Sequence, residues 1–235
     1  MMKKIIKELE RFYCRLTDYF FLTENFHKYQ IKHSKIYSNN YILNDNQFSF
    51  VHPPKSAGTS ISTFLYENNI DIYYSAHNLV SINCDPKKFK YITVIRDPVK
   101  RIKSFYEMQL NNKKLSFHNH AKKGLNYFVS KVKINQNCFC KFLIGDLNCD
   151  IDEEKFERAK DNLKNFFFII NFDNLEKDIE VLKSKLNIKE SMKHIGKNKK
   201  ERKNYSDNEN NDIVINNTYD IKLWDYFQKN IKNLA

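Results

Sequence analysis

The sequence predicts an α/β domain in which a mainly parallel sheet is covered by helices on both faces. Three short runs rich in β-branched and aromatic residues predict strands, at residues 47–52, 91–95 and 166–170. Each run is followed by a segment with the apolar spacing of a helix, and this strand–helix order is typical of parallel sheets. Ligands of such sheets lie beyond the carboxyl ends of the strands. We therefore expect the chemistry just after residues 52, 95 and 170.

The remaining elements follow from the same spacing rules. Asp97 and Pro98, directly after the second strand, predict a helix N-cap and a first-turn proline. Between the first two strand–helix units we expect a short extended piece at residues 72–74 and then a loop containing His77. Helices are expected at residues 59–68, 98–110, 122–131, 136–144, 153–165, 174–186 and 219–231.

The two ends of the chain differ from its centre. Apolar residues at helical spacing over residues 2–30 predict a helix, so we expect an N-terminal helical extension over residues 1–46 and the main domain over residues 47–235. Residues 189–203 carry seven basic side chains against two acids and are followed by the polar run NYSDNEN. This stretch predicts a mobile basic loop.

Composition indicates one globular unit. The 235 residues are 41% hydrophobic and 14% aromatic, with 4 Gly and 4 Pro, which suits a single buried core. The longest aliphatic and aromatic run, residues 166–170, is far shorter than the roughly 20 residues that cross a bilayer. The N-terminus lacks the apolar core of a signal peptide. We therefore expect a cytoplasmic protein with no transmembrane span.

Charge and cysteine content exclude two further classes of site. The formal net charge is +12, but only six of the 40 basic residues are Arg, the side chain that forks onto phosphate and guanine. We therefore expect no nucleic-acid partner. The five cysteines are scattered without a C-x-x-C spacing, so no zinc site is expected.

The most informative stretch is FSFVHPPKSAGTSISTFL, residues 48–65. It places a strand, a proline turn, Lys55, Gly58 and two hydroxyl residues before a helix. Backbone N–H groups at a helix start converge on anions, and the helix dipole favours negative charge there. The stretch therefore predicts an anion cradle. It is not the usual nucleotide loop, because that loop has its lysine after the second glycine.

A second stretch, YITVIRDPVKRIKSFYEMQL over residues 91–110, contributes another basic group. Arg96 ends the second strand, and Ser104 lies eight residues later on the following helix. We expect these two side chains to share a second phosphate, with Arg96 reaching from the strand end.

In order and spacing, HPPKSAGTS followed by VIRDPVKRIKSFY resembles the paired signature of sulfotransferases that use 3′-phosphoadenosine 5′-phosphosulfate (PAPS), in particular the carbohydrate enzymes of the heparan sulfate 2-O and chondroitin/dermatan type. The resemblance implies a three-layer, P-loop-like domain and a PAPS co-substrate released as adenosine 3′,5′-bisphosphate. Because the transferred group carries less charge than a phosphoryl group, we expect no metal. The resemblance also implies that Arg96 and Ser104 bind the 3′-phosphate. The residues implied to bind the 5′-phosphosulfate are Lys55, Ser56, Ala57, Gly58, Thr59 and Ser60.

Transfer of a sulfuryl group resembles phosphoryl transfer, so positioning and electrostatics carry it. We expect Lys55 to stabilise the departing phosphate oxygen. The acceptor hydroxyl needs a base, and His77, in a segment similar to that of the heparan enzyme's catalytic histidine, is the first candidate. Secondary candidates on the acceptor side are His118, His120 and Glu107.

Other residues and readings stay open at this point. His52 at the first strand end is expected to make a structural hydrogen bond, and Arg101 fits either a phosphate contact or a solvated or salt-bridged position. The expected acceptor is a carbohydrate or glycan, and the basic surface is compatible with an anionic one. The alternatives are a nucleotide-dependent kinase with an unusual phosphate loop and a non-catalytic module that binds polyanions through residues 189–203.

Overall fold

The computed structural model describes residues 41–192 and 205–230, with the backbone alone at residues 74–77. Its centre is a four-stranded sheet in the order β2-β1-β3-β4, and all three strand pairs are parallel. The strands are β1 (Phe48–Val51), β2 (Ile72–Asn78), β3 (Lys90–Ile95) and β4 (Phe168–Asn171). Val51 pairs with Asn78, and Ile95 pairs with Asn171, so the carboxyl ends of all four strands meet at one edge.

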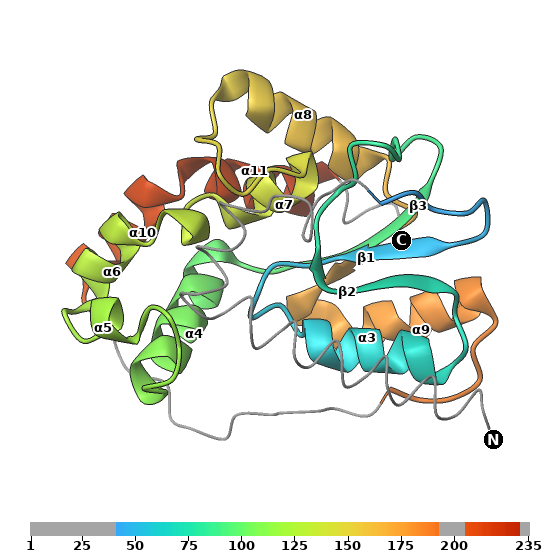
Figure 1. Ribbon diagram of the computed structural model, residues 1–235, viewed down its shortest axis with the longest axis horizontal. Helices are drawn as coiled ribbons and strands as arrows, with labels where there is room; N and C mark the ends of the chain where they lie inside the picture. The colour runs from blue at the N-terminus through green and yellow to red at the C-terminus, as the bar shows by residue number, and fades with distance from the viewer. Residues whose placement is uncertain (1–40, 193–204, 231–235) are drawn as a thin grey trace.

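One face of the sheet is covered by α3 (Gly58–Glu67) and α9 (Leu175–Leu186), which lie together below it in Figure 1. Successive residues of a strand point to opposite faces, so every second strand residue faces these helices. The buried cluster on this side contains pairs of strand residues two apart. These pairs are Phe48 and Phe50, Ile92 and Val94, and Phe168 and Ile170.

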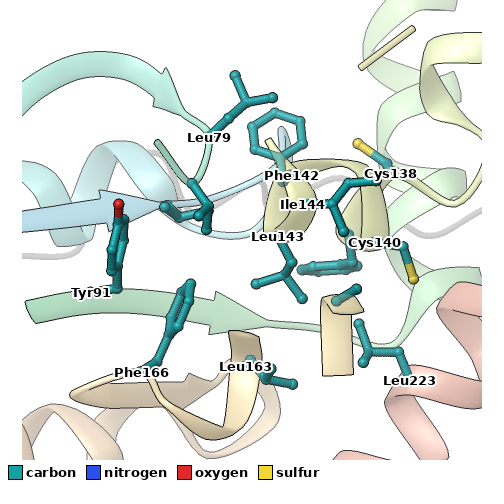
Figure 2. Packing of buried hydrophobic residues seen from close by; sticks show 14 of the residues in the cluster. Leu79, Tyr91, Cys138, Cys140, Phe142, Leu143, Ile144, Leu163, Phe166 and Leu223 are labelled. Atoms are coloured by element: carbon teal, nitrogen blue, oxygen red, sulfur yellow. The ribbon is translucent and has the colours of Figure 1, made fainter. Parts of the chain in front are cut away.

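The opposite face is covered by α7 (Cys138–Ile144), α8 (Glu153–Lys164) and α11 (Thr218–Asn230). Tyr91 of β3 packs here with Phe142, Phe166 and Leu223, as Figure 2 shows. The molecule is thus a three-layer α/β fold with an all-parallel sheet, and the expected fold class is confirmed to that extent.

A group of helices beside the sheet has its own buried core (Figure 1). It consists of α4 (Pro98–Asn111), α5 (His118–Ala121), α6 (Leu125–Lys131) and α10 (Asp207–Asn216). Ile102, Phe105, Phe128 and Ile213 are at most 3% exposed within it. α4 belongs both to this group and to the carboxyl edge of the sheet, because it follows β3 directly.

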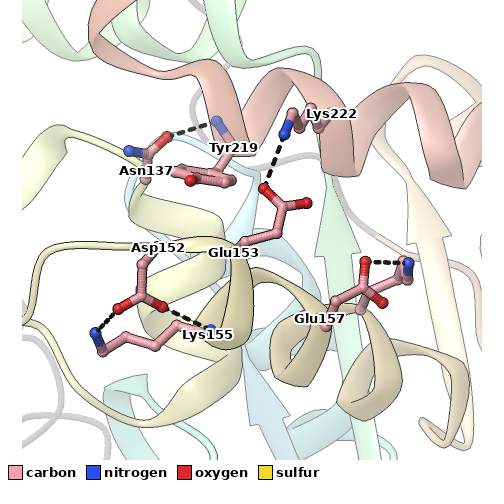
Figure 3. A network of polar contacts seen from close by, with 8 residues as sticks. Asn137, Asp152, Glu153, Lys155, Glu157, Tyr219 and Lys222 are labelled. Atoms are coloured by element: carbon pink, nitrogen blue, oxygen red, sulfur yellow. Dashed lines mark hydrogen bonds and ion pairs between the residues drawn. The ribbon is translucent and has the colours of Figure 1, made fainter.

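Polar contacts fix α11 against α7 and α8 (Figure 3). Lys222 forms an ion pair with Glu153 at 3.0 Å, and the Tyr219 amide donates to Asn137 Oδ1 at 3.0 Å. Asp220 is 1% exposed and accepts from the amides of Phe139 and Cys140, each at 3.0 Å. Because these amides begin α7, the Asp220 carboxylate caps that helix.

One expectation about the elements is wrong, one helix starts later than expected, and one helix was not expected. β2 continues to Asn78, so His77 lies in a strand and not in a loop, because the chain resumes pairing with Val51 after an irregularity. The helix expected over residues 122–131 is α6, which starts at Leu125, directly after Gly124 with its φ of 99°. The polar run after Tyr205 begins α10, whose capping box joins Ser206 and Glu209.

Other expectations lie outside the described residues, namely the helix over residues 2–30 and the basic loop from residue 193 onward. The domain boundary at residue 46 stays a prediction, although Tyr41 and Leu43 already pack into the core and Tyr41 Oη donates to Leu79 O at 2.7 Å. Within residues 41–192 and 205–230, no helix combines the length and the apolar character needed to cross a bilayer.

Candidate functional site

The loop between β1 and α3 is shaped by two left-handed residues. Lys55 has φ of 70° and Ala57 has φ of 59°. Ala57 is the N-cap of α3 and makes no side-chain cap hydrogen bond. The Ile61 amide bonds Ala57 O at 3.1 Å, so the amides of residues 58–60 precede the first α-helical bond of α3. A helix start with amides of this kind favours an anion.

Ser56 adds a second polar feature to this loop. Its side chain is fully buried, and its Oγ has no hydrogen-bond partner among the described residues. A buried hydroxyl normally has a partner, because leaving one unpaired costs about 1–3 kcal/mol. The loop therefore holds a hydroxyl with unused hydrogen-bonding capacity beside the start of α3.

His52 and Gly58 are packed so closely that the glycine is necessary. His52 is 3% exposed and stacks on Phe50, with ring centroids 4.5 Å apart. A Cβ placed on Gly58 would lie 1.9 Å from His52 Cδ2 and 2.0 Å from Nε2. The ring of His52 thus sets how closely α3 approaches the end of β1.

Gly58→Ala should therefore lower the free energy of unfolding by about 1–3 kcal/mol through overpacking. Urea unfolding measures the change. His52→Ala removes the ring that the new methyl would strike, so the cost of Gly58→Ala should fall in that background. An equal cost in both backgrounds would contradict this reading of the loop.

Arg96 connects the end of β3 to this loop. Its Nη1 donates to Lys55 O at 2.6 Å, and its guanidinium lies 4.1 Å from the ring centroid of Phe172. Phe172 follows β4 directly. Arg96 is 8% exposed. Through these two contacts its guanidinium links the ends of three adjacent strands, β1, β3 and β4.

Lys55 shares its electrostatic surroundings with Arg96 and Glu107. Burial lowers the pKa of Lys55 from its ordinary value of 10.5, the positive charge of Arg96 lowers it further, and the carboxylate of Glu107 acts in the opposite direction. Two neighbouring positive charges, those of Lys55 and Arg96, outweigh the single carboxylate of Glu107 around this loop. The loop is therefore suited to bind an anion.

α4 presents one polar face to the carboxyl edge of the sheet. Asp97 caps α4 by accepting from the Lys100 amide at 2.9 Å, so the expected cap and first-turn Pro98 are confirmed. Lys100 Nζ forms an ion pair with Asp173 after β4, at 3.0 Å. Residues 100, 104 and 107 follow helical spacing, so Ser104 lies on the same face, one turn from each of its neighbours. Ser104 is half-buried.

Of the other expected residues, one has no described side chain, and the rest have side chains with defined contacts. His77 lies near the carboxyl end of β2, next to the end of β1, and its side chain is outside the described part of the chain. Arg101 is fully buried and donates to Asn135 Oδ1 at 2.8 Å, which makes it structural. On α5, His118 Nδ1 lies 3.0 Å from Gln109 O, and the His120 ring packs against Phe117 and Tyr127.

Sequence reasoning missed two residues that contact this site. Phe172 supports Arg96, and it follows the strand end where chemistry was expected. Tyr205 donates from Oη to Glu107 Oε1 at 2.8 Å, across 98 residues of sequence. The S-x-x-E capping box beside Tyr205 was the available signal for a helix there.

Comparison with models of known protein families gave no match, and neither did comparison with curated proteins. Within the described ranges, no three His, Cys, Asp or Glu side chains gather as a metal site. The loop after β1, Arg96 and the polar face of α4 are therefore the features that bear on function.

Proposed function

We propose that this chain is a PAPS-dependent sulfotransferase of P-loop-like fold, which transfers a sulfuryl group to a hydroxyl of a carbohydrate acceptor. The single observation that carries the proposal is the hydrogen bond from Arg96 to Lys55 O, 2.6 Å long, which joins the two sequence motifs at one strand edge. A donor with phosphates on the 3′ and 5′ oxygens of its ribose needs two basic groups at a fixed separation, and this bond holds the two motifs together.

The residues fit such a donor at two places. The 5′-phosphosulfate would be held by the loop and helix start at Lys55, Ser56, Ala57, Gly58, Thr59 and Ser60, where the orphaned Ser56 Oγ favours a ligand. The 3′-phosphate would be held by Arg96, whose guanidinium offers five N–H donors, and by Ser104. PAPS supplies an activated sulfuryl group, and adenosine 3′,5′-bisphosphate remains as product.

Each group has a separable task in the transfer. Lys55 stabilises negative charge on the departing phosphate oxygen. Arg96 holds the backbone of Lys55 in place through its hydrogen bond to Lys55 O. The transferred sulfuryl group carries less charge than a phosphoryl group, so the proposal includes no metal. A base must take the acceptor proton, for which His77 and Glu107 are the candidates.

Calorimetry with adenosine 3′,5′-bisphosphate tests the function without knowledge of the acceptor. We expect saturable binding to the wild-type chain and a loss of at least tenfold in affinity in Lys55→Ala, equal to about 1.4 kcal/mol. Lys87→Ala is the matched control, because Lys87 is exposed and paired with Asp161. It should bind as the wild type does.

Two outcomes would replace the proposal. Binding of ATP with Mg²⁺ but not of adenosine 3′,5′-bisphosphate would favour a nucleotide-dependent kinase. Binding of heparin with a steep salt dependence and no loss in Lys55→Ala would favour a polyanion-binding module. If the bisphosphate binds, labelled PAPS with fractionated cell glycans identifies the acceptor.

A further inference from the structure

Glu107 is an acid at the edge of a site built to attract anions. It lies half-buried on the polar face of α4, one turn beyond Ser104. Its charge acts on Lys55, in opposition to burial and to Arg96. A carboxylate repels phosphates, so it does not serve the donor. Its place on the polar face of α4, one turn beyond Ser104, suits an uncharged partner, and in sulfuryl transfer that partner is the acceptor hydroxyl.

Tyr205 fixes this carboxylate in one orientation. The Tyr205 hydroxyl bonds Glu107 Oε1 at 2.8 Å, and its ring meets Tyr106 edge-on with centroids 6.5 Å apart. Burial raises the pKa of Tyr205 well above its ordinary value of 10.0. The hydrogen bond to Glu107 and the negative charge of Glu107 raise this pKa further. Tyr205 therefore keeps its proton and donates it to the carboxylate.

The second oxygen of the carboxylate is left for a ligand. In the part of the chain that the structure describes, Oε2 of Glu107 makes no hydrogen bond, while Oε1 accepts from Tyr205. An ionised carboxylate accepts at both oxygens, so Oε2 keeps its capacity to accept a proton. Among the described histidines, the His52 ring is 3% exposed and packed against Phe50, which makes it a poor alternative.

We infer that Glu107, oriented by Tyr205, is the base that takes the proton of the acceptor hydroxyl; this rests on the proposed function. The proton passes to Glu107 Oε2 as the acceptor oxygen forms its bond to sulfur. The bond from sulfur to the 5′-phosphate oxygen breaks, and its electron pair stays on that oxygen, where Lys55 stabilises it. In an in-line transfer, the base takes the proton of the attacking oxygen, and the cation stabilises the negative charge that develops on the leaving oxygen.

The test compares Glu107→Gln with His77→Ala and the wild type. Glutamine still accepts from Tyr205 but takes no proton. We expect Glu107→Gln to lose at least about 100-fold in transfer from labelled PAPS to glycan. It should bind adenosine 3′,5′-bisphosphate at least as tightly as the wild type, because a repelling charge is gone. Tyr205→Phe should lose less than Glu107→Gln. Glu180→Gln, which removes an exposed acid paired with Lys183 on α9, is the control and should be unaffected.

Chemical rescue separates a base from a structural residue. Formate should restore transfer in Glu107→Ala, where space is open for a carboxylate, and not in Glu107→Gln. The inference falls if Glu107→Gln keeps its transfer rate, if it loses bisphosphate binding, if formate fails to rescue Glu107→Ala, or if His77→Ala alone removes turnover. A wild-type chain that does not bind the bisphosphate, or that binds it and transfers to no glycan, would instead overturn the proposed function.

Discussion

Lys55→Ala is expected to reduce transfer of the labelled sulfuryl group by about 10²–10³-fold, the usual effect of removing one preorganised donor to developing charge. The loss should appear in turnover and in donor affinity together, because Lys55 is the half-buried cation of the loop after β1. Initial rates at saturating glycan, with Lys87→Ala as the exposed control, measure it. A Lys55→Ala chain that keeps a tenth of the wild-type rate would remove Lys55 from the chemistry.

The same residue gives the donor affinity a pH dependence of known sign. Burial and Arg96 lower the pKa of Lys55 below 10.5, and the charged form is the one that binds an anion. Affinity for adenosine 3′,5′-bisphosphate is therefore complete at pH values below the lowered pKa. The affinity falls as the pH rises through the lowered pKa of Lys55, at a lower pH than that at which an ordinary lysine loses its proton. Lys55→Arg stays charged throughout, so its affinity should be flat over the same alkaline range.

The sequence predicted the parts of the fold that depend on local rules. The strands β1 and β3 were expected from their residue types, and the start of α4 from Asp97 and Pro98, because a cap needs only neighbouring residues. The length of β2 was missed because it depends on pairing between Asn78 and Val51 across an irregular ladder. No local pattern carries that information.

The candidate site divides in the same way. Lys55 and Arg96 were identifiable because each follows a strand within a short motif, and parallel strand ends share one edge. The bond between Glu107 and Tyr205 was not identifiable from the sequence, because the two residues are 98 positions apart and meet only when α10 packs on α4. The same holds for the contact of Gly58 with His52, which depends on the angle at which α3 leaves the sheet.

Arg96→Ala should be the second most damaging change, because it removes a ligand group and a structural bond at once. Without the guanidinium, Lys55 O loses its 2.6 Å partner in a loop that already holds two left-handed residues. Leaving a buried acceptor unpaired costs about 1–3 kcal/mol, and because Lys55 O is only partly buried the lower end applies. We expect a drop of that size in the free energy of unfolding, measured in urea, and a loss of bisphosphate binding at least equal to that of Lys55→Ala.

Arg96→Lys distinguishes the two losses. The ammonium of a lysine keeps the charge and can still donate to Lys55 O. It cannot stack flat on Phe172, as the guanidinium does at 4.1 Å, and it cannot bind a phosphate through two parallel hydrogen bonds. Arg96→Lys should therefore recover most of the stability and only part of the binding, and Phe172→Leu should lower binding with Arg96 intact. If Arg96→Ala instead bound the bisphosphate as the wild type does, the loop after β1 would hold its shape without Arg96. The two motifs would then not act on one ligand, since the bond that joins them would have no effect on it.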